Sequence, residues 1–186
     1  MIRHLLITLP VALLAACNNN NREPVMPPEN NIANGMAMTP PAPAPADGNA
    51  AYLAKAGAGD LFEIESSRAI LAKTDDKAVK DFANMMIDAH GKSTAKLKAA
   101  AAQAGIAVAP PRLEPDQQAK LESIKSASAA EATRDYLTAQ REAHAAALAL
   151  HQGYARNGPT PALKTAAGEI AGVVQQHIDR LAKLPK

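Results

Sequence analysis

Helix-ending signals divide most of this sequence into helices of defined length. From about residue 50, apolar residues recur with the period of an α-helix, and no region alternates with the period of two that is typical of a strand. Gly105, with Pro110 beyond it, and Asn157-Gly158 end helices, whereas Thr160-Pro161 is a capping residue followed by a proline that opens one. We therefore predict an all-α fold with four long helices and one short helix, at about 50–73, 75–104, 115–126, 130–156 and 161–183.

The lengths of the connections predict the order in which these helices pack. The first and second long helices join tightly, with Thr74 as the expected cap of the second, and so do the third and fourth, which makes each pair an antiparallel hairpin. About 25 residues link the two hairpins, whereas 2–8 residues are typical between neighbours in a bundle. Such a link permits a crossover that makes the second and third long helices run parallel, as in ferritin-like bundles. The alternative is a simple up-down bundle with a short capping helix, and we favour the crossover.

The residues before this helical domain are predicted to form a tether. Residues 17–49 include a run of four asparagines and many prolines but few large apolar side chains, so they cannot build a core. A flexible chain of this length has an r.m.s. span of roughly 30 Å. The predicted domain therefore covers residues 50–184 and stands away from whatever holds the N-terminus.

Residues 1–16 have the features of a signal peptide. Arg3 supplies a positive charge, and the nearly continuous apolar run 5–14 is too short to span a bilayer. The run ends in Leu-Ala-Ala before Cys17, the only cysteine of the chain, and this spelling resembles the lipobox of a bacterial lipoprotein. The resemblance implies cleavage before Cys17 and attachment of lipid to it. An ordinary secretory signal followed by a chance cysteine is the alternative.

Lipidation would make the membrane a partner of this chain through its N-terminus. Several acyl chains on one residue anchor a protein stably, whereas one chain is marginal. By resemblance to other lipoproteins, Asn18 in place of an aspartate favours the outer membrane. We therefore expect a lipid-anchored envelope protein whose domain faces the periplasm.

Three of the long helices place a histidine at the centre of the apolar stripe. These residues are His90, His144 and His177, at positions where a core leucine is usual, and His151 lies one heptad after His144. The first long helix has no histidine but offers Glu63, with Asp60 one turn earlier. Counting residues outward from the hairpin turns puts His90 level with Asp60, and His177 level with Gln140.

Two interpretations of these histidines remain open. An unpaired buried polar group costs on the order of 1–3 kcal/mol, so each imidazole needs a partner. The rings could share a transition metal with an oxygen ligand from Glu63 or Asp60, and Zn, Fe and Cu suit such a set equally. Alternatively, the rings form hydrogen bonds to those carboxylates and to Gln140, with no ligand at all. A di-iron centre is not expected, because the Glu-x-x-His motif of such bundles is absent: Ile87, Arg141 and Val174 stand three residues before the histidines.

A family resemblance rests on these same helices. The pattern Phe82-Ala83-x-x-Met86-Ile87-x-x-His90, Tyr136-Leu137 with His144, and a late His177 resembles a bacterial envelope family classed as a domain of unknown function. Its members are often labelled outer membrane proteins and have a ferritin-like bundle fold. The resemblance covers about residues 50–183 and implies a role for the histidine and carboxylate positions, but no activity. Similar sequences usually have Asp-His at the second-helix motif, whereas here Asp88 is shifted by one residue, which makes it a secondary candidate only.

Several function classes are disfavoured. The net charge of +2 provides no basic field for nucleic acid, and no Gly-rich phosphate loop predicts a nucleotide or flavin. Since no nucleophile–base pair can be named, we expect a protein that is not an enzyme and that binds a ligand or serves a structural or stress-related role in the envelope. The alternative is an interaction module with a purely structural polar core, whose helical surface contacts envelope proteins or a second copy.

Overall fold

The structure is a computed structural model that describes residues 47–184. Its elements are five helices and, within these residues, no strand: α1 (Asp47–Leu71), α2 (Lys77–Gln103), α3 (Pro115–Ser126), α4 (Ala129–Asn157) and α5 (Pro161–Leu181). The predicted all-α class and the short extra helix are confirmed, although α1 begins at Asp47 rather than near residue 50. The signal peptide, Cys17 and nearly all of the predicted tether lie outside the described residues.

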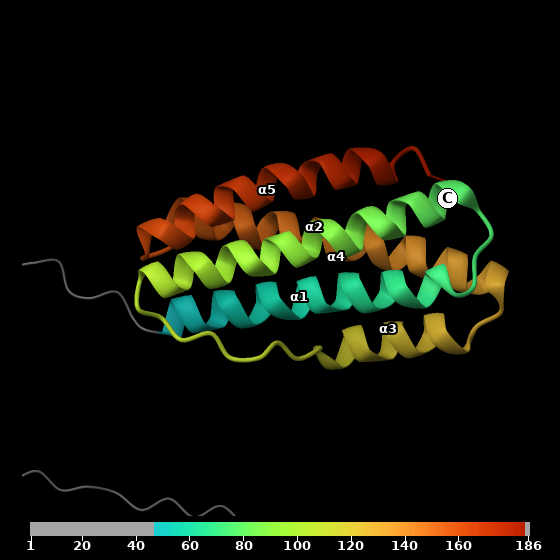
Figure 1. The fold of residues 1–186 in the computed structure, drawn as a ribbon, viewed down its shortest axis with the longest axis horizontal. Helices are drawn as coiled ribbons and strands as arrows, with labels where there is room; N and C mark the ends of the chain where they lie inside the picture. Colours follow the sequence, from blue (N-terminus) through green and yellow to red (C-terminus); the bar gives the residue numbers. More distant parts are fainter. Residues whose placement is uncertain (1–46, 185–186) are drawn as a thin grey trace, which may run out of the picture. The chain divides into compact units, whose positions relative to one another are not determined.

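The four long helices form one bundle. Helices α1 and α2 pack as a hairpin, as do α4 and α5, and the hairpins meet through α1 against α4 and α2 against α5. Figure 1 shows that α2 and α4 run in the same direction, opposite to α1 and α5. The crossover connection is thus confirmed, and the simple up-down alternative is wrong.

Helix α3 belongs to the connection that makes this crossover possible. The chain returns along the bundle after α2, and α3 packs over α1 and α4 before α4 begins (Figure 1). Leu121 and Ile124 are buried and attach α3 to the core. The long link between the hairpins is therefore a packed part of the bundle.

The start of α2 differs from its predicted cap. Asp76 is the N-cap residue, and its Oδ1 accepts hydrogen bonds from the backbone N–H groups of Ala78 at 2.8 Å and Val79 at 3.1 Å. The Thr74 hydroxyl instead accepts a hydrogen bond from the Asp76 backbone N–H at 3.2 Å. The prediction of Thr74 as the cap was wrong because the carboxylate lies closer to the first turn and satisfies two of its free donors.

The ends of the other long helices follow the glycine and proline signals. Gly105 has a φ of +68° after α2, a conformation that glycine adopts without steric cost. Thr160 and Pro161 open α5 as predicted, but the Thr160 hydroxyl donates to Asn49 Oδ1 on α1 and makes no capping bond. This contact ties the start of α5 to the first helix of the bundle.

Two apolar clusters flank a polar layer in the core. One contains Phe62, Phe82 and Tyr136, and the other contains Leu53 and Leu163. Between them along the helices lie the buried polar side chains, namely Asp60, Glu63, His90, Gln140, His144 and His177. None of the helices in residues 47–184 is both long and apolar enough to cross a membrane.

Candidate metal centre

Three buried histidines from three helices meet in the polar layer. His90 on α2, His144 on α4 and His177 on α5 are 5%, 0% and 5% exposed. Each offers a ring nitrogen, and these nitrogens all lie within 4.8 Å of one another. The ring centroids are 5.3–5.6 Å apart, so no other side chain separates the rings. Within the described residues, His90, His144 and His177 are the side chains whose possible ligand atoms lie close enough together to bind one metal ion.

The hydrogen bonds of His144 fix which of its nitrogens is available. Its Nδ1 donates to the backbone carbonyl of Gln140 at 2.8 Å, since a carbonyl oxygen can only accept. The neutral ring therefore has its lone pair on Nε2, which lies 3.3 Å from Nδ1 of His177. In the absence of an ion, His177 Nδ1 donates to this lone pair.

His90 is held by a carboxylate from α1. Its Nδ1 donates to Asp60 Oδ1 at 2.8 Å, and Asp60 Oδ2 accepts a hydrogen bond from the Thr94 hydroxyl at 2.8 Å. His90 Nε2 is buried and has no hydrogen-bond partner. A histidine whose second nitrogen is held by a carboxylate is the usual arrangement of a metal ligand in proteins. Asp60 therefore orients His90 and is not itself directed at the cluster.

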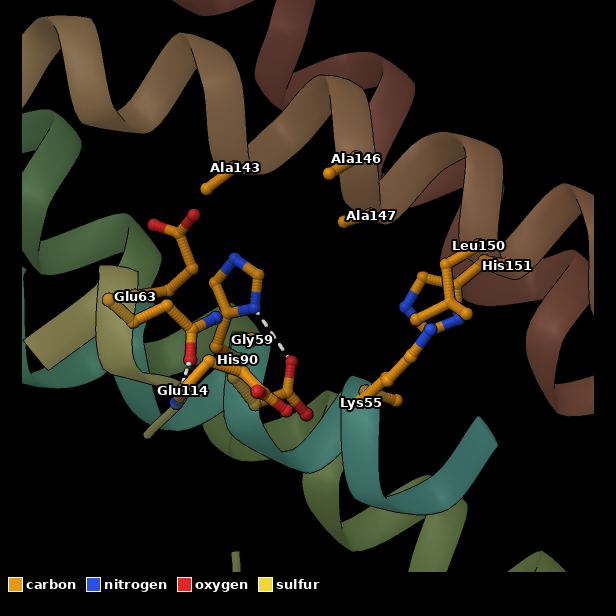
Figure 2. Close-up of a pocket in the computed structure, with 13 residues that line it drawn as sticks. Lys55, Gly59, Glu63, His90, Glu114, Ala143, Ala146, Ala147, Leu150 and His151 are labelled. Carbon is orange, nitrogen blue, oxygen red and sulfur yellow. Dashed lines mark hydrogen bonds and ion pairs between the residues drawn. The ribbon is translucent and has the colours of Figure 1, made fainter. Parts of the chain in front are cut away.

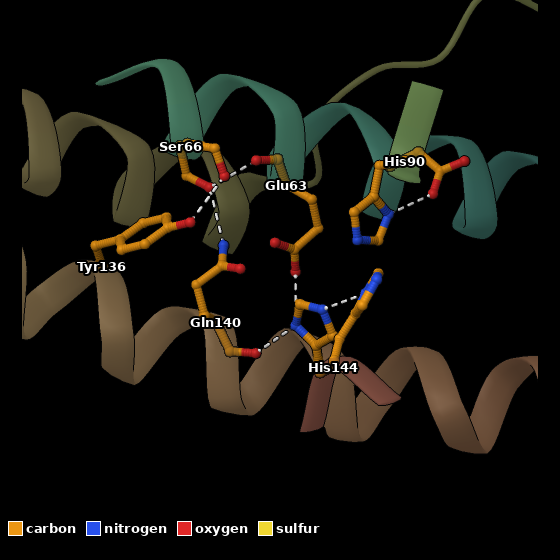
Figure 3. Close-up of polar contacts among 9 residues, drawn as sticks. Glu63, Ser66, His90, Tyr136, Gln140 and His144 are labelled. Carbon is orange, nitrogen blue, oxygen red and sulfur yellow. Dashed lines mark hydrogen bonds and ion pairs between the residues drawn. The ribbon is translucent and has the colours of Figure 1, made fainter. Parts of the chain in front are cut away.

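Glu63 lies beside the cluster with one oxygen free of hydrogen bonds. Its side chain is 3% exposed, and its Oε1 is 3.4 Å from His144 Nδ1. Figure 3 shows the Glu63 carboxylate directed toward the ring of His144, with the ring of His90 nearby. Its Oε2 is buried without a partner, like Nε2 of His90. A buried polar atom without a partner costs roughly 1–3 kcal/mol, so both atoms are available to bind water or a ligand.

Burial sets the protonation states of two of the histidines. Burial, together with the neighbouring His90, lowers the pKa of His144 to about 3 and that of His177 to about 4. Both rings are therefore neutral at pH 7, the form that coordinates a metal.

The third histidine and the glutamate shift in the opposite direction. Burial lowers the pKa of His90, but the hydrogen bond to Asp60 and the charge of Glu63 outweigh it, so the net pKa is raised. Burial raises the pKa of Glu63 to about 7, although His90 and the Gln140 amide act in the other direction.

A hydrogen-bond network next to the cluster ties α1 to α4. Ser67 Oγ and Tyr136 Oη are 2.8 Å apart, and Gln140 Nε2 donates to Ser66 Oγ at 3.2 Å (Figure 3). These contacts hold the Gln140 side chain against α1, one turn before His144 on α4. These contacts were not predicted from the sequence, and neither was the role of Thr94. The position of Thr94 one turn after His90, on the same face of α2, could have indicated it.

Two secondary candidates lie outside the cluster. His151 is buried, but its Nδ1 lies 2.9 Å from the Tyr52 hydroxyl, and it is not part of the three-histidine group. Asp88 is exposed and pairs with Lys92 at 2.6 Å. Asp88 lies at the pocket between α2 and α5 that contains His90 and His177, but it is not part of the three-histidine group.

Two pockets reach the cluster from different sides. One of about 390 Å³ is lined by α1, α3 and α4 and contains Glu63, His90 and His151 (Figure 2). The other, of about 450 Å³, lies between α2 and α5 and contains His90 and His177. The histidines are therefore buried, yet an ion or small molecule has only a short distance to travel from the surface.

Among the solved structures with similar folds are proteins from two bacteria. A DUF305 fragment from Deinococcus radiodurans has a TM-score of 0.64 at 12% sequence identity, covering 73% of this chain and 93% of that one. A DUF305 protein from Streptomyces coelicolor, inferred to be secreted, has a TM-score of 0.61 at 15% identity, covering 73% and 88%. At these identities the likeness shows the fold alone.

The sequence comparisons identify the family. No curated protein matches the chain. The family described as Domain of unknown function (DUF4142) matches residues 34–184, which include the whole described bundle. The expected resemblance to a family of unknown function is thereby confirmed, and the chain belongs to the DUF4142 family.

Proposed function

We propose that this protein is a lipid-anchored envelope protein whose bundle binds a transition-metal ion through His90, His144 and His177. The observation that carries the proposal is the convergence of three buried ring nitrogens within 4.8 Å, one of them without any hydrogen-bond partner. A purely structural polar core would satisfy each ring, whereas an ion would bind Nε2 of His90, Nε2 of His144 and, once its proton has moved to Nε2, Nδ1 of His177.

The spacing of the nitrogens supports this proposal. Two nitrogens on one tetrahedral ion, each at ~2.0–2.1 Å, lie about 3.3–3.4 Å apart. His144 Nε2 and His177 Nδ1 are already 3.3 Å apart. The wider separations, which reach up to 4.8 Å, would contract by about 1.5 Å on binding. Glu63 is outside this group, so we assign it to the surroundings of the ion and leave one coordination position open.

Metal analysis of the lipid-free chain, residues 18–186 secreted behind an ordinary cleavable leader, tests the proposal. We expect about one equivalent of Zn, Cu or Fe after loading and desalting. An ion present at a hundredfold excess over its Kd should stabilise the fold by about 2.7 kcal/mol. His177→Ala should abolish both effects. His151→Ala is the matched control, because it removes a buried histidine outside the cluster. Absence of bound metal and an unchanged Tm with all three ions would refute the proposal.

The envelope location is proposed from the N-terminus. The Leu-Ala-Ala-Cys17 spelling supports lipidation, and the secretion inferred for the Streptomyces coelicolor neighbour is in line with export. The one-crossover connectivity supports the ferritin-like classification. Labelling cells with a radioactive fatty acid should mark the wild-type chain and not Cys17→Ala. Fractionation should place the labelled chain in the outer membrane, and label in the inner membrane only would contradict the role given to Asn18.

An interaction module remains the rival function. It would need an apolar surface on which envelope partners or a second copy could dock. In residues 47–184, Val173 is the large hydrophobic side chain that is exposed, at 42%. One such side chain does not make a docking face, so we place metal binding first.

A further inference from the structure

The pocket between α1 and α4 leads to the two unpartnered polar atoms of the site. Figure 2 shows Glu63 and His90 at one end of this pocket and Lys55 and His151 at the other. Glu63 and His90 are 3% and 5% exposed, and Glu63 Oε2 and His90 Nε2 make no hydrogen bond. A ligand that enters this pocket would meet both a coordinating nitrogen and a free acceptor.

Small side chains keep the pocket open where the two helices face each other. Gly59 on α1 and Ala143 and Ala147 on α4 line it. A Cβ atom built on Gly59 would meet nothing within 4 Å, so there is unfilled space directly beside the helix. The volume of about 390 Å³ is ample for a molecule of a few heavy atoms, since water occupies about 30 Å³ in the liquid.

The charges of the lining indicate which kind of ligand fits. Three carboxylates, of Asp60, Glu63 and Glu114, line the pocket, against one lysine, Lys55. These carboxylates offset the positive charge of an ion held by the histidines, so an anion gains less there than at a bare ion, whereas an uncharged ligand meets no repulsion. A free carboxylate oxygen also favours a ligand atom that carries hydrogen.

We infer that a small uncharged ligand enters through the α1–α4 pocket and occupies the open position of the ion. The ligand coordinates through an oxygen or nitrogen atom that carries hydrogen, and this hydrogen is donated to Glu63 Oε2. The inference rests on the proposed metal site and adds the class of ligand and its route. Water is the simplest member of this class, and hydroxylamine is a larger one that is uncharged at pH 7.5.

The test uses the lipid-free chain loaded with Co(II), whose visible absorption bands report its coordination. Hydroxylamine should shift the bands with a saturable dependence. It should bind at least about tenfold more tightly than azide, an anion without hydrogen, because a hydrogen bond to a charged acceptor contributes roughly 1.5–3 kcal/mol. Gly59→Leu, which places a side chain in the open space of the pocket, should weaken hydroxylamine binding at least tenfold without loss of cobalt.

Two control variants locate the route. Gly172→Leu makes the same change at an exposed position of α5 with open space around it, and should leave hydroxylamine binding within twofold of wild type. Ala89→Leu places a larger side chain in the other pocket, between α2 and α5. This variant should also leave hydroxylamine binding unchanged.

The failures of the two proposals are distinguishable. A chain that loads cobalt but shows no band shift with hydroxylamine, or that prefers azide, overturns the ligand inference alone. Loss of binding in Ala89→Leu with normal binding in Gly59→Leu overturns the route. A chain that cannot be loaded with Co(II), Zn, Cu or Fe overturns the metal site and the ligand inference together.

Discussion

Asp60 on α1 binds Nδ1 of His90 on α2 and leaves Nε2 of that ring without a hydrogen-bond partner. Asp60 Oδ1 accepts the Nδ1 hydrogen at 2.8 Å, and both side chains are buried. The second carboxylate oxygen accepts from Thr94, so the carboxylate cannot rotate without losing a bond. The hydrogen bond to Asp60 occupies Nδ1 of His90, so Nε2 is the ring nitrogen that can coordinate an ion.

Asp60→Asn should therefore weaken metal binding without unfolding the protein. The amide oxygen can still accept the His90 hydrogen, but the negative charge that makes the ring more basic is lost. Removing such a partner typically costs 10- to 100-fold in metal affinity. Titration against a competing chelator measures this change. Asp88→Asn is the matched control on the same helix as His90, and its exposed side chain should leave the Kd unaltered. Equal Kd values for the two variants would contradict the orienting role of Asp60.

Connection lengths made the fold predictable from the sequence. Two short turns require antiparallel hairpins, and a link too long for neighbouring helices permits a crossover. The N-cap of α2 was misassigned, because Thr74 and Asp76 are both good capping residues in sequence. Their distances to the first turn decide between them, and these depend on the backbone path.

The site was predictable in part. Helical periodicity identified the three histidines as core residues, and counting from the turns paired His90 with Asp60, as the structure has it. The tautomers were not predictable, because the carbonyl of Gln140 and the hydroxyl of Thr94 act through contacts that exist only after folding. The Ala-lined pocket was missed for a similar reason: small residues in a helix do not reveal whether a neighbouring side chain fills the space beside them.

The metal-free protein should lose stability in mild acid. The pKa of His144 falls from 6.5 to about 3, and those of His151 and His177 fall to about 4, all chiefly through burial. Between pH 6.5 and these values the unfolded chain binds more protons, so the stability present above pH 6.5 is lost as the pH falls. Glu63 has the opposite sign, because its raised pKa of about 7 means that its contribution is lost as the pH rises from 4.5 to 7. His90, whose pKa is also raised, acts in the same direction as Glu63, at higher pH.

On unfolding near pH 5, His144, His151 and His177 each bind about one proton, and Glu63 releases about one. The unfolded chain therefore binds about two more protons than the folded chain. The free energy of unfolding should then change by about 2.7 kcal/mol per pH unit. Urea unfolding of the chelator-treated chain at closely spaced pH values around pH 5 measures this slope, which decreases toward pH 7 as the histidines of the unfolded chain lose their protons. His151→Phe should reduce it by about one proton, or roughly 1.4 kcal/mol per pH unit. Stability that stays constant, or that falls as the pH rises from 5 to 6, would contradict the burial of neutral histidines.

Tyr136→Phe should destabilise the bundle by leaving the Ser67 hydroxyl without a partner. Both side chains are fully buried, and their oxygens are 2.8 Å apart. An unsatisfied buried hydroxyl costs about 1–3 kcal/mol. Ser67→Ala in the same chain removes that hydroxyl, so the double variant should be less destabilised than the sum of the single variants. Urea unfolding of all four proteins gives the coupling energy, and additive effects would show that the pair does not interact.

Gly158→Ala should destabilise the end of α4, although Gly158 has an ordinary negative φ of −62°. A Cβ atom there would lie 2.5 Å from Cε1 of Tyr154 and 2.6 Å from its carbonyl oxygen. The Tyr154 ring cannot easily move away, because it stacks on Tyr52 with centroids 3.8 Å apart and its hydroxyl donates to Asn49. We expect a loss of about 1–3 kcal/mol, as for other overpacked sites. Gly153→Ala on the same helix has open space around its Cβ and should stabilise the protein by up to about 1 kcal/mol. Urea unfolding gives the change in the free energy of unfolding for each variant. Changes of opposite sign would show that close approach to Tyr154, and not backbone conformation, requires glycine at position 158. Equal changes would contradict this.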